Sequence, residues 1–236
     1  MTAKQKKRRK PINEEYMIPV EPLTHNQKLF FDEWEKGQMI YAYGVAGTGK
    51  TFIALYKALK DVLNEYTPYE KIYIVRSLVA TREIGFLPGD HEDKSSLYQI
   101  PYKNMVQSMF EMPDDASYDM LYDNLKSQET VSFWSTSFIR GTTLDNAIVI
   151  IDECQNLNFH ELDSIITRVG QDSKIIFCGD AAQTDLQKIS ERTGIIDFQR
   201  ILQKMEEFSL IEFGIDDIVR SGLVKSYLIN KINLGL

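Results

Sequence analysis

Eight residues, Gly44-Val45-Ala46-Gly47-Thr48-Gly49-Lys50-Thr51, separate an apolar run at 38–43 from a helix-like segment at 51–63. This order of strand, G-x-x-x-x-G-K-[ST] and helix is the pattern of a phosphate-binding P-loop. Glycines open backbone conformations that other residues avoid, so successive N–H groups can point at phosphate oxygens. The alternative interpretation is a glycine-rich turn that merely joins a strand to a helix.

The two residues that end this motif carry the predicted chemistry. The helix that follows directs the positive end of its dipole at the same anion. The Lys50 ammonium would reach the β- and γ-phosphates, and the Thr51 hydroxyl would bind Mg²⁺. The motif therefore predicts a nucleoside triphosphate and a magnesium ion as ligands.

The composition places the chain among cytoplasmic globular proteins. Its 236 residues suffice for one sizeable α/β domain. No apolar run is long enough to cross a bilayer, and the basic N-terminus is not followed by an apolar stretch, so we expect neither a membrane span nor a signal peptide. Cys154 and Cys178 lie in or beside apolar strand-like runs, and we interpret them as reduced, structural residues.

The net charge of −7 is unevenly distributed. Six of the 27 basic residues lie between Lys4 and Lys10, a segment without an acidic residue. We expect residues 1–20 to form a basic, disordered tail and residues 21–236 to form the folded domain. The tail would bind a nucleic-acid backbone or act only as a solubility tail, and composition does not separate these two interpretations.

Apolar runs and helix-like segments alternate along the rest of the chain. Strands are expected at 38–43, 71–76, 131–134, 147–153, 174–178 and 210–213, and helices at 25–36, 51–63, 102–111, 117–126, 195–207 and from Asp216 onward. This alternation predicts a mostly parallel sheet with right-handed crossovers and helices on both faces. The segment 77–101 has no clear periodicity and is expected to be a functional or disordered loop.

Two carboxylates, Asp152 and Glu153, end the apolar run that begins at Ala147. Such a pair is weakly informative by itself. Beside a P-loop the same pair becomes a strong indication of a nucleotide site, because Lys50, Thr51 and Mg²⁺ need an acidic partner. We predict that Asp152 holds the ion and that Glu153 acts as the general base for an attacking water.

Four further polar residues have two interpretations each. Gln27 stands three residues after the expected N-cap Thr24, so it either closes a capping box or bonds the edge of adenine. Gln183, in the loop after the strand at 174–178, either senses the γ-phosphate or is a turn residue. Arg76 and Arg82 flank the start of the segment 77–101, and each would contact a phosphate backbone or be a solvated surface charge.

The ordered set of motifs resembles the PhoH-like family, which comprises RecA-type P-loop ATPases similar to the first motor domain of superfamily 1 helicases. The matching stretches are Leu23–Gln27, the P-loop, Val75–Val79, Gly85–Gly89, Arg140–Thr143, Asp152–Asn156, Gly179–Gln183 and Asp217–Arg220. They span nearly all of the chain after the tail.

The resemblance implies an ATPase that uses Mg²⁺ and is coupled to RNA or single-stranded DNA. It assigns adenine recognition to Gln27 and a link between the γ-phosphate and conformation to Gln183. It also implies a homo-oligomer, in the form of a hexameric ring.

Superfamily 1 helicases carry a second motor domain that supplies an arginine to the ATP site, and from this sequence we expect only the first motor domain. Either hydrolysis is slow, or a neighbouring subunit supplies an arginine finger. Arg220 is the first candidate and Arg192 the second. The alternative for Arg220 is an exposed helix charge or a salt bridge to Asp216 or Asp217.

Other functions remain to be weighed against a motor. The main alternative is an ATP-controlled oligomeric switch or scaffold without motor activity. A small-molecule kinase is disfavoured because Glu153, directly after Asp152, suits attack by water. A GTPase is disfavoured because the chain has no N-K-x-D; Asn230-Lys231-Ile232-Asn233 lacks the aspartate that would read guanine.

Overall fold

The computed structural model describes residues 12–76, 91–139, 141–180 and 189–234, with the backbone alone at 91–97, 137–138 and 189–193. Six parallel strands form one sheet in the order β3-β2-β4-β5-β1-β6. Helices cover both of its faces. This confirms the predicted single α/β domain of RecA-like P-loop type.

The strands are β1 (Met39–Gly44), β2 (Lys71–Arg76), β3 (Val131–Ser135), β4 (Ala147–Asp152), β5 (Lys174–Gly179) and β6 (Phe208–Phe213). The helices are α1 (His25–Glu35), α2 (Lys50–Leu63), α3 (His91–Gln107), α4 (Asp115–Ser127), α5 (Thr136–Ile139), α6 (Phe159–Ile166), α7 (Ile189–Leu202) and α8 (Gly222–Asn233). Short 3₁₀ turns lie at Glu14–Tyr16, Cys154–Asn156 and Ile215–Asp217.

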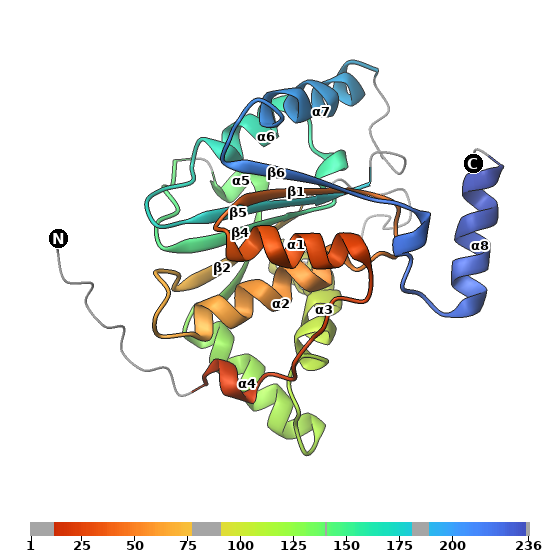
Figure 1. Cartoon of the computed structure of the whole chain (residues 1–236). Coiled ribbons are helices and arrows are strands. Elements are labelled where there is room, and N and C mark those ends of the chain that lie inside the picture. Colours follow the sequence, from red (N-terminus) through yellow and green to blue (C-terminus); the bar gives the residue numbers. More distant parts are fainter. Residues whose placement is uncertain (1–11, 77–90, 140, 181–188, 235–236) are drawn as a thin grey trace.

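Two hydrophobic cores lie on opposite faces of the sheet. Helices α1 to α4 cover one face, while α5, α6 and α7 cover the other (Figure 1). Alternate residues of β4 point to the two cores, with Ile148 and Ile150 in the first and Val149 and Ile151 in the second. All six residues of this central strand are buried, as expected for a strand covered on both faces.

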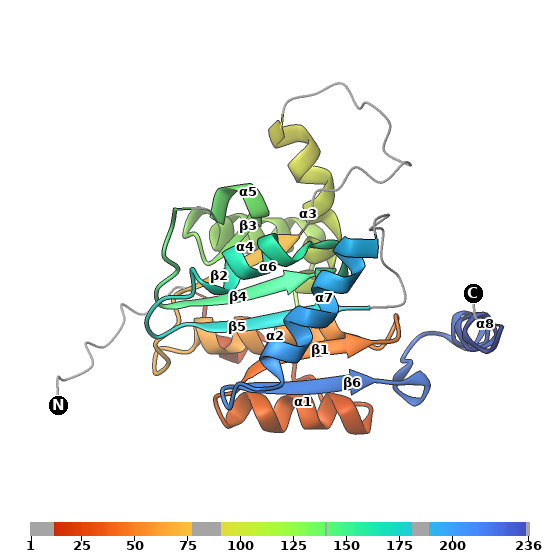
Figure 2. The same cartoon turned by 90° about the horizontal axis from the view of Figure 1, so that it is seen from above.

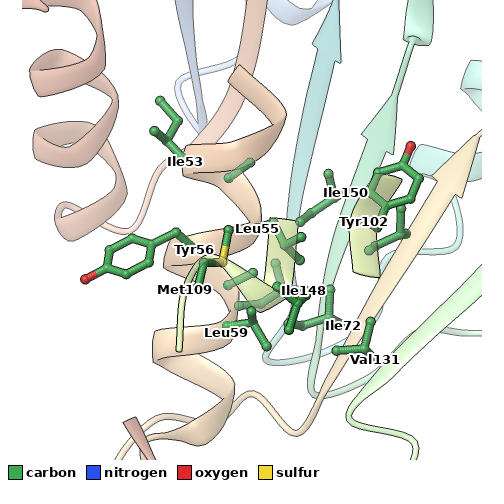
Figure 3. Close-up of a cluster of buried hydrophobic side chains, with 14 of the residues drawn as sticks. Ile53, Leu55, Tyr56, Leu59, Ile72, Tyr102, Met109, Val131, Ile148 and Ile150 are labelled. Carbon is green, nitrogen blue, oxygen red and sulfur yellow. The ribbon is translucent and has the colours of Figure 1, made fainter. Parts of the chain in front are cut away.

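The helix after the P-loop is anchored by the larger core. Leu55 and Leu59 of α2 lie beside Ile72 and Ile148 of the sheet (Figure 3). Leu55 and Leu59 are four residues apart, so they lie on the same side of the helix. Because the body of α2 is fixed by this packing, its N-terminus is held at the sheet edge where the P-loop ends.

The strand order determines which segments meet at that edge. Strand β5 lies between the P-loop strand β1 and the carboxylate strand β4. The carboxyl ends of parallel strands share one edge, so Gly44, Gly179 and Asp152 come together there. Helix α8 stands beyond the same edge in both views (Figures 1 and 2).

Helix α3 corrects one expectation. Its backbone is helical from His91, so the prediction of an irregular segment up to residue 101 is wrong from that residue onward. Pro101 lies inside the helix although it removes a hydrogen bond, a cost of about 3 kcal/mol. Burial of Tyr102 and Val106, one turn apart on the inner side, offsets this cost.

The C-terminal helix is also different from the prediction. Asp216 belongs to a single 3₁₀ turn, Ile215–Asp217, and α8 starts only at Gly222. Arg220 therefore lies in the connection between them and not on a helix.

Two more differences concern helix positions. Helix α7 spans Ile189–Leu202 where residues 195–207 were expected. Helix α6 was not predicted, although its N-terminus carries a full capping box in which Asn158 and Glu161 satisfy each other's backbone N–H groups.

The packed body extends ahead of the expected boundary at residue 21. Met17 is 8% exposed and forms a β-bridge with Phe110. Both cysteines are buried and free. No helix within the described residues combines the length and the apolar character that a membrane crossing needs.

Candidate functional site

The P-loop connects β1 to α2 through three glycines with positive φ. The φ values are 110° at Gly44, 75° at Gly47 and 83° at Gly49. A Cβ at Gly44 would overlap the carbonyl oxygen of Phe213, and one at Gly47 would lie 2.9 Å from Cγ of Arg220. The glycines are therefore required both by backbone conformation and by close neighbours.

The N-terminus of α2 differs from those of α1, α4 and α6. Thr24, Asp114 and Asn158 cap α1, α4 and α6 with their side chains. Gly49 precedes α2 and offers no side chain to its first N–H groups. Together with the P-loop that precedes it, this end of α2 presents donors and a positive dipole to an anion.

Lys50 directs its ammonium into the loop. Its Nζ donates to the carbonyl oxygens of Gly44 (3.0 Å) and Val45 (2.7 Å) and to the Thr48 hydroxyl (3.2 Å). The side chain is 8% exposed. Burial lowers the pKa of Lys50, while Asp180 and the two carboxylates after β4 oppose that effect. A phosphate could replace the carbonyls as a charged partner.

Asp152 is bonded through both carboxylate oxygens. The Thr51 hydroxyl donates to Oδ1 and the Tyr102 hydroxyl donates to Oδ2, each at 2.6 Å. Arg76 lies opposite Asp152 in the register of β2 and β4. Thr51 and Asp152 therefore meet as predicted, and Tyr102 is a partner that the sequence did not indicate.

Glu153 has an unusual backbone and a fixed side chain. Its φ of 51° and ψ of 42° are left-handed, a conformation that is strained for a residue with a Cβ and is concentrated at functional sites. Gln155 donates from Nε2 to Glu153 Oε2 at 2.6 Å and accepts from the Asp180 N–H at 2.9 Å. Gln155 thus ties the carboxylate to the end of β5.

Gln27 makes the backbone bond of a capping box but not its side-chain bond. Its backbone N–H donates to the Thr24 hydroxyl, as in a capping box. Its side chain instead accepts from the Leu23 N–H and donates to the carbonyl oxygen of Thr48, both at 2.8 Å. The amide is therefore held against the P-loop, where one lone pair and one N–H remain for another partner.

Arg220 lies against its own P-loop. A Cβ at Gly47 would contact Arg220 and also Leu228 of α8. In the part of the chain that the structure describes, no ion pair joins Arg220 to Asp216 or Asp217. Asp217 instead accepts from Asn26 and from the Gly214 N–H.

These residues line one pocket of about 600 Å³, a volume typical of small-ligand sites. It collects the predicted residues Gln27, Ala46, Gly47, Thr48, Gly49, Lys50, Thr51, Asp152, Glu153 and Arg220, together with Arg76. Arg76 is half-buried, and it lines this pocket. Gly44 and Val45 contribute the carbonyls that Lys50 contacts.

Several predicted residues cannot be placed. Gln183, Arg82, Arg140, the stretch 85–89 and the basic segment 4–10 lie outside the described residues. Arg192 lies on α7, but its side chain is not among those described.

The donor atoms at the end of β4 suit a hard cation. Thr51 and Asp152 offer only oxygen, and Glu153 lines the same pocket. Within the described ranges no cluster of three or more His, Cys, Asp or Glu residues could enclose a metal. Mg²⁺ in nucleotide sites uses one or two carboxylates together with phosphate oxygens, so this sparse set fits it.

Comparison with known proteins shows which protein family the chain belongs to. The sequence model of the family described as PhoH-like protein matches residues 19–230. The chain is 32% identical over 210 residues to a PhoH-like protein of Bacillus subtilis (strain 168), covering 85% of the chain and 60% of that relative. It is 32% identical over 196 residues to Protein PhoH of Escherichia coli (strain K12), covering 82% and 53%. The chain thus spans between about half and three fifths of these relatives.

One solved structure shows the same fold. The large terminase of a thermophilic bacteriophage, in complex with ADP, aligns with a TM-score of 0.51 and 14% identity. The alignment covers 87% of this chain and 49% of the terminase. At this identity the similarity concerns the fold alone.

Proposed function

Because the chain belongs to the PhoH-like protein family, we propose that it binds ATP with Mg²⁺, hydrolyses it and couples hydrolysis to RNA or single-stranded DNA. One observation carries this proposal. Lys50, Thr51, Asp152 and Glu153, from two segments about 100 residues apart, converge on one pocket at the carboxyl edge of the sheet. Such a set serves phosphate binding and attack by water.

The triphosphate lies over the N-terminus of α2. The Lys50 ammonium exchanges its bonds to the loop carbonyls for bonds to phosphate oxygens. Mg²⁺, held by Thr51, Asp152 and the phosphates, would neutralise charge on the phosphoryl group. Gln27 binds the adenine edge with the amide hydrogen and lone pair that Thr48 and Leu23 leave over.

Glu153 activates the nucleophile. It takes a proton from a water as the water oxygen bonds to the γ-phosphorus, and the bond between that phosphorus and the β–γ bridging oxygen breaks. Gln155 holds the carboxylate for this step through Nε2. Gln183, three residues after Asp180 in the sequence, remains a predicted γ-phosphate sensor.

The oligomer is part of the proposal. We place the protein in the cytoplasm as a homo-oligomeric ring, a hexamer by family resemblance, and the two buried free cysteines suit a reducing compartment. The alternative, an ATP-controlled switch or scaffold, differs in one property: its turnover ignores nucleic acid.

Steady-state ATP hydrolysis with and without single-stranded RNA or DNA tests the coupling. We expect one polymer to raise the rate several-fold, in a salt-sensitive way, because phosphate contacts weaken as salt rises. A sizing experiment under the same conditions gives the oligomeric state. Turnover that ignores both polymers in a well-formed oligomer would overturn the motor and favour the switch.

Arg220 is expected to act within its own subunit, because its side chain lies over its own Gly47. A mixture of two variant proteins, one carrying Arg220→Ala and the other carrying Glu153→Gln, tests this. If Arg220 acts in its own subunit, every site in a mixed ring lacks one of the two groups and the mixture stays inactive. If it acts on a neighbour, about one site in four of a random ring regains both groups.

The control for this experiment is a mixture of wild type with Glu153→Gln, each labelled for energy transfer, which reports whether subunits exchange. Arg220 is exposed, so its replacement should leave the melting temperature unchanged. Recovery of activity in the first mixture would assign Arg220 to the neighbouring site, as the trans-acting arginine finger suggested by the sequence.

A further inference from the structure

The Tyr102 hydroxyl donates to Asp152 Oδ2 at 2.6 Å, from a helix that the P-loop motifs do not include. We propose that Tyr102 is the positioning residue of the magnesium site, and that its hydroxyl fixes the orientation in which Asp152 meets the ion. This inference rests on the proposed function. It makes α3 a third structural support of the site, beside the P-loop and β4.

The carboxylate is held from two sides. Thr51 bonds Oδ1 and Tyr102 bonds Oδ2, so the plane of the Asp152 carboxylate is set by two donors from different elements. Each carboxylate oxygen has a second lone pair, which stays available to an ion or its water shell. Hydrogen bonds from outside the ligand set fix ligand orientation in metal sites generally.

The position of Tyr102 suits this role better than a packing role alone. Its side chain is 2% exposed, and its ring packs against Phe133 with centroids 5.3 Å apart. The ring borders the buried cluster beneath the sheet, and the hydroxyl points away from that cluster (Figure 3). Phenylalanine would fill the same volume, so packing does not account for the hydroxyl.

Two neighbouring tyrosines provide the contrast. Tyr118 and Tyr122 of α4 are also buried in this core. The Tyr118 hydroxyl donates to the carbonyl oxygen of Lys103, and no partner of the Tyr122 hydroxyl is found among the described residues. Of these three hydroxyls, that of Tyr102 bonds a carboxylate of the pocket. A hydrogen bond to a charged acceptor is stronger and shorter than one to a neutral group.

Arg76 completes the arrangement. It stands opposite Asp152 in the strand register and interacts with both Tyr102 and Asp152. Its positive charge attracts the Asp152 carboxylate, to which the Tyr102 hydroxyl donates.

The test compares Tyr102→Phe with Tyr118→Phe. Affinity for a fluorescent ATP analogue is measured by titration of Mg²⁺ and, separately, in EDTA. For Tyr102→Phe we expect the Mg²⁺ concentration at half-saturation to rise about 10-fold or more, as for lost outer-shell partners of other metals. Affinity in EDTA should stay within about twofold, because the P-loop contacts are untouched, and excess Mg²⁺ should restore binding.

Tyr118→Phe also removes a buried hydroxyl and should leave the Mg²⁺ titration unchanged. An unchanged half-saturating concentration in folded Tyr102→Phe would overturn the inference. Thr51→Ala separates this failure from that of the proposed function. If Thr51→Ala shifts the titration but Tyr102→Phe does not, only the role of Tyr102 is wrong; if wild type binds nucleotide without regard to Mg²⁺, both are wrong.

Discussion

Replacement of Glu153 by Gln is expected to lower the rate of ATP hydrolysis by about 10²- to 10⁴-fold, the range that general bases contribute. The amide cannot take a proton from the attacking water. Binding should survive, because Lys50 and Thr51, which hold the phosphates in our proposal, are unaltered. The measurement is single-turnover hydrolysis beside the affinity for ATP with Mg²⁺.

The substitution should leave the local structure intact. A glutamine at this position can still accept the bond from Gln155 Nε2 through its own carbonyl oxygen. Its backbone preference resembles that of glutamate, so the left-handed conformation at 153 costs no more than before. An unchanged melting temperature would show that the loss concerns chemistry.

The matched control is Glu161→Gln, on the helix that follows. Glu161 belongs to the capping box of α6, in which glutamine serves as well as glutamate. We expect this variant to hydrolyse ATP at the rate of wild type. If Glu153→Gln kept more than about a tenth of the wild-type rate, Glu153 would not be the base, since a general base contributes at least about 10²-fold.

The sequence predicted most reliably what depends on neighbours along the chain. Strand β2 has the predicted bounds, because a run of apolar residues with a basic residue at each end leaves little freedom in placing a buried strand. The P-loop was equally readable, because the chain conformation at Gly44, Gly47 and Gly49 is a local property.

What the sequence did not reveal depends on residues far apart. Tyr102 bonds Asp152 across 50 positions, and nothing in the residues beside Tyr102 indicates such a partner. Arg220 was assigned to a helix because Asp216 resembles a helix start, whereas the structure places it against Gly47. The capping box at Asn158 was a local signal, and it would have predicted α6.

Replacement of Lys50 by Ala tests the interpretation from which the whole assignment starts. We expect ATP affinity to fall by about 2–5 kcal/mol, the cost of removing one partner from a buried charged contact, or roughly 30- to several thousand-fold in Kd. The effect should be larger for ATP than for ADP, because the ammonium would lie between the β- and γ-phosphates. Isothermal titration with each nucleotide measures both.

The control for Lys50 is Lys60→Ala, which removes an exposed charge from the same helix. It changes the net charge equally but leaves the pocket intact, so ATP affinity should stay within about twofold, as for a screened surface charge. Lys50→Ala also removes a buried charge that is bonded only to neutral oxygens, so the protein should stay folded. If folded Lys50→Ala bound ATP as tightly as wild type, residues 44–51 would be only a glycine-rich turn, and the proposed roles of Asp152, Glu153 and Tyr102 would lose their basis.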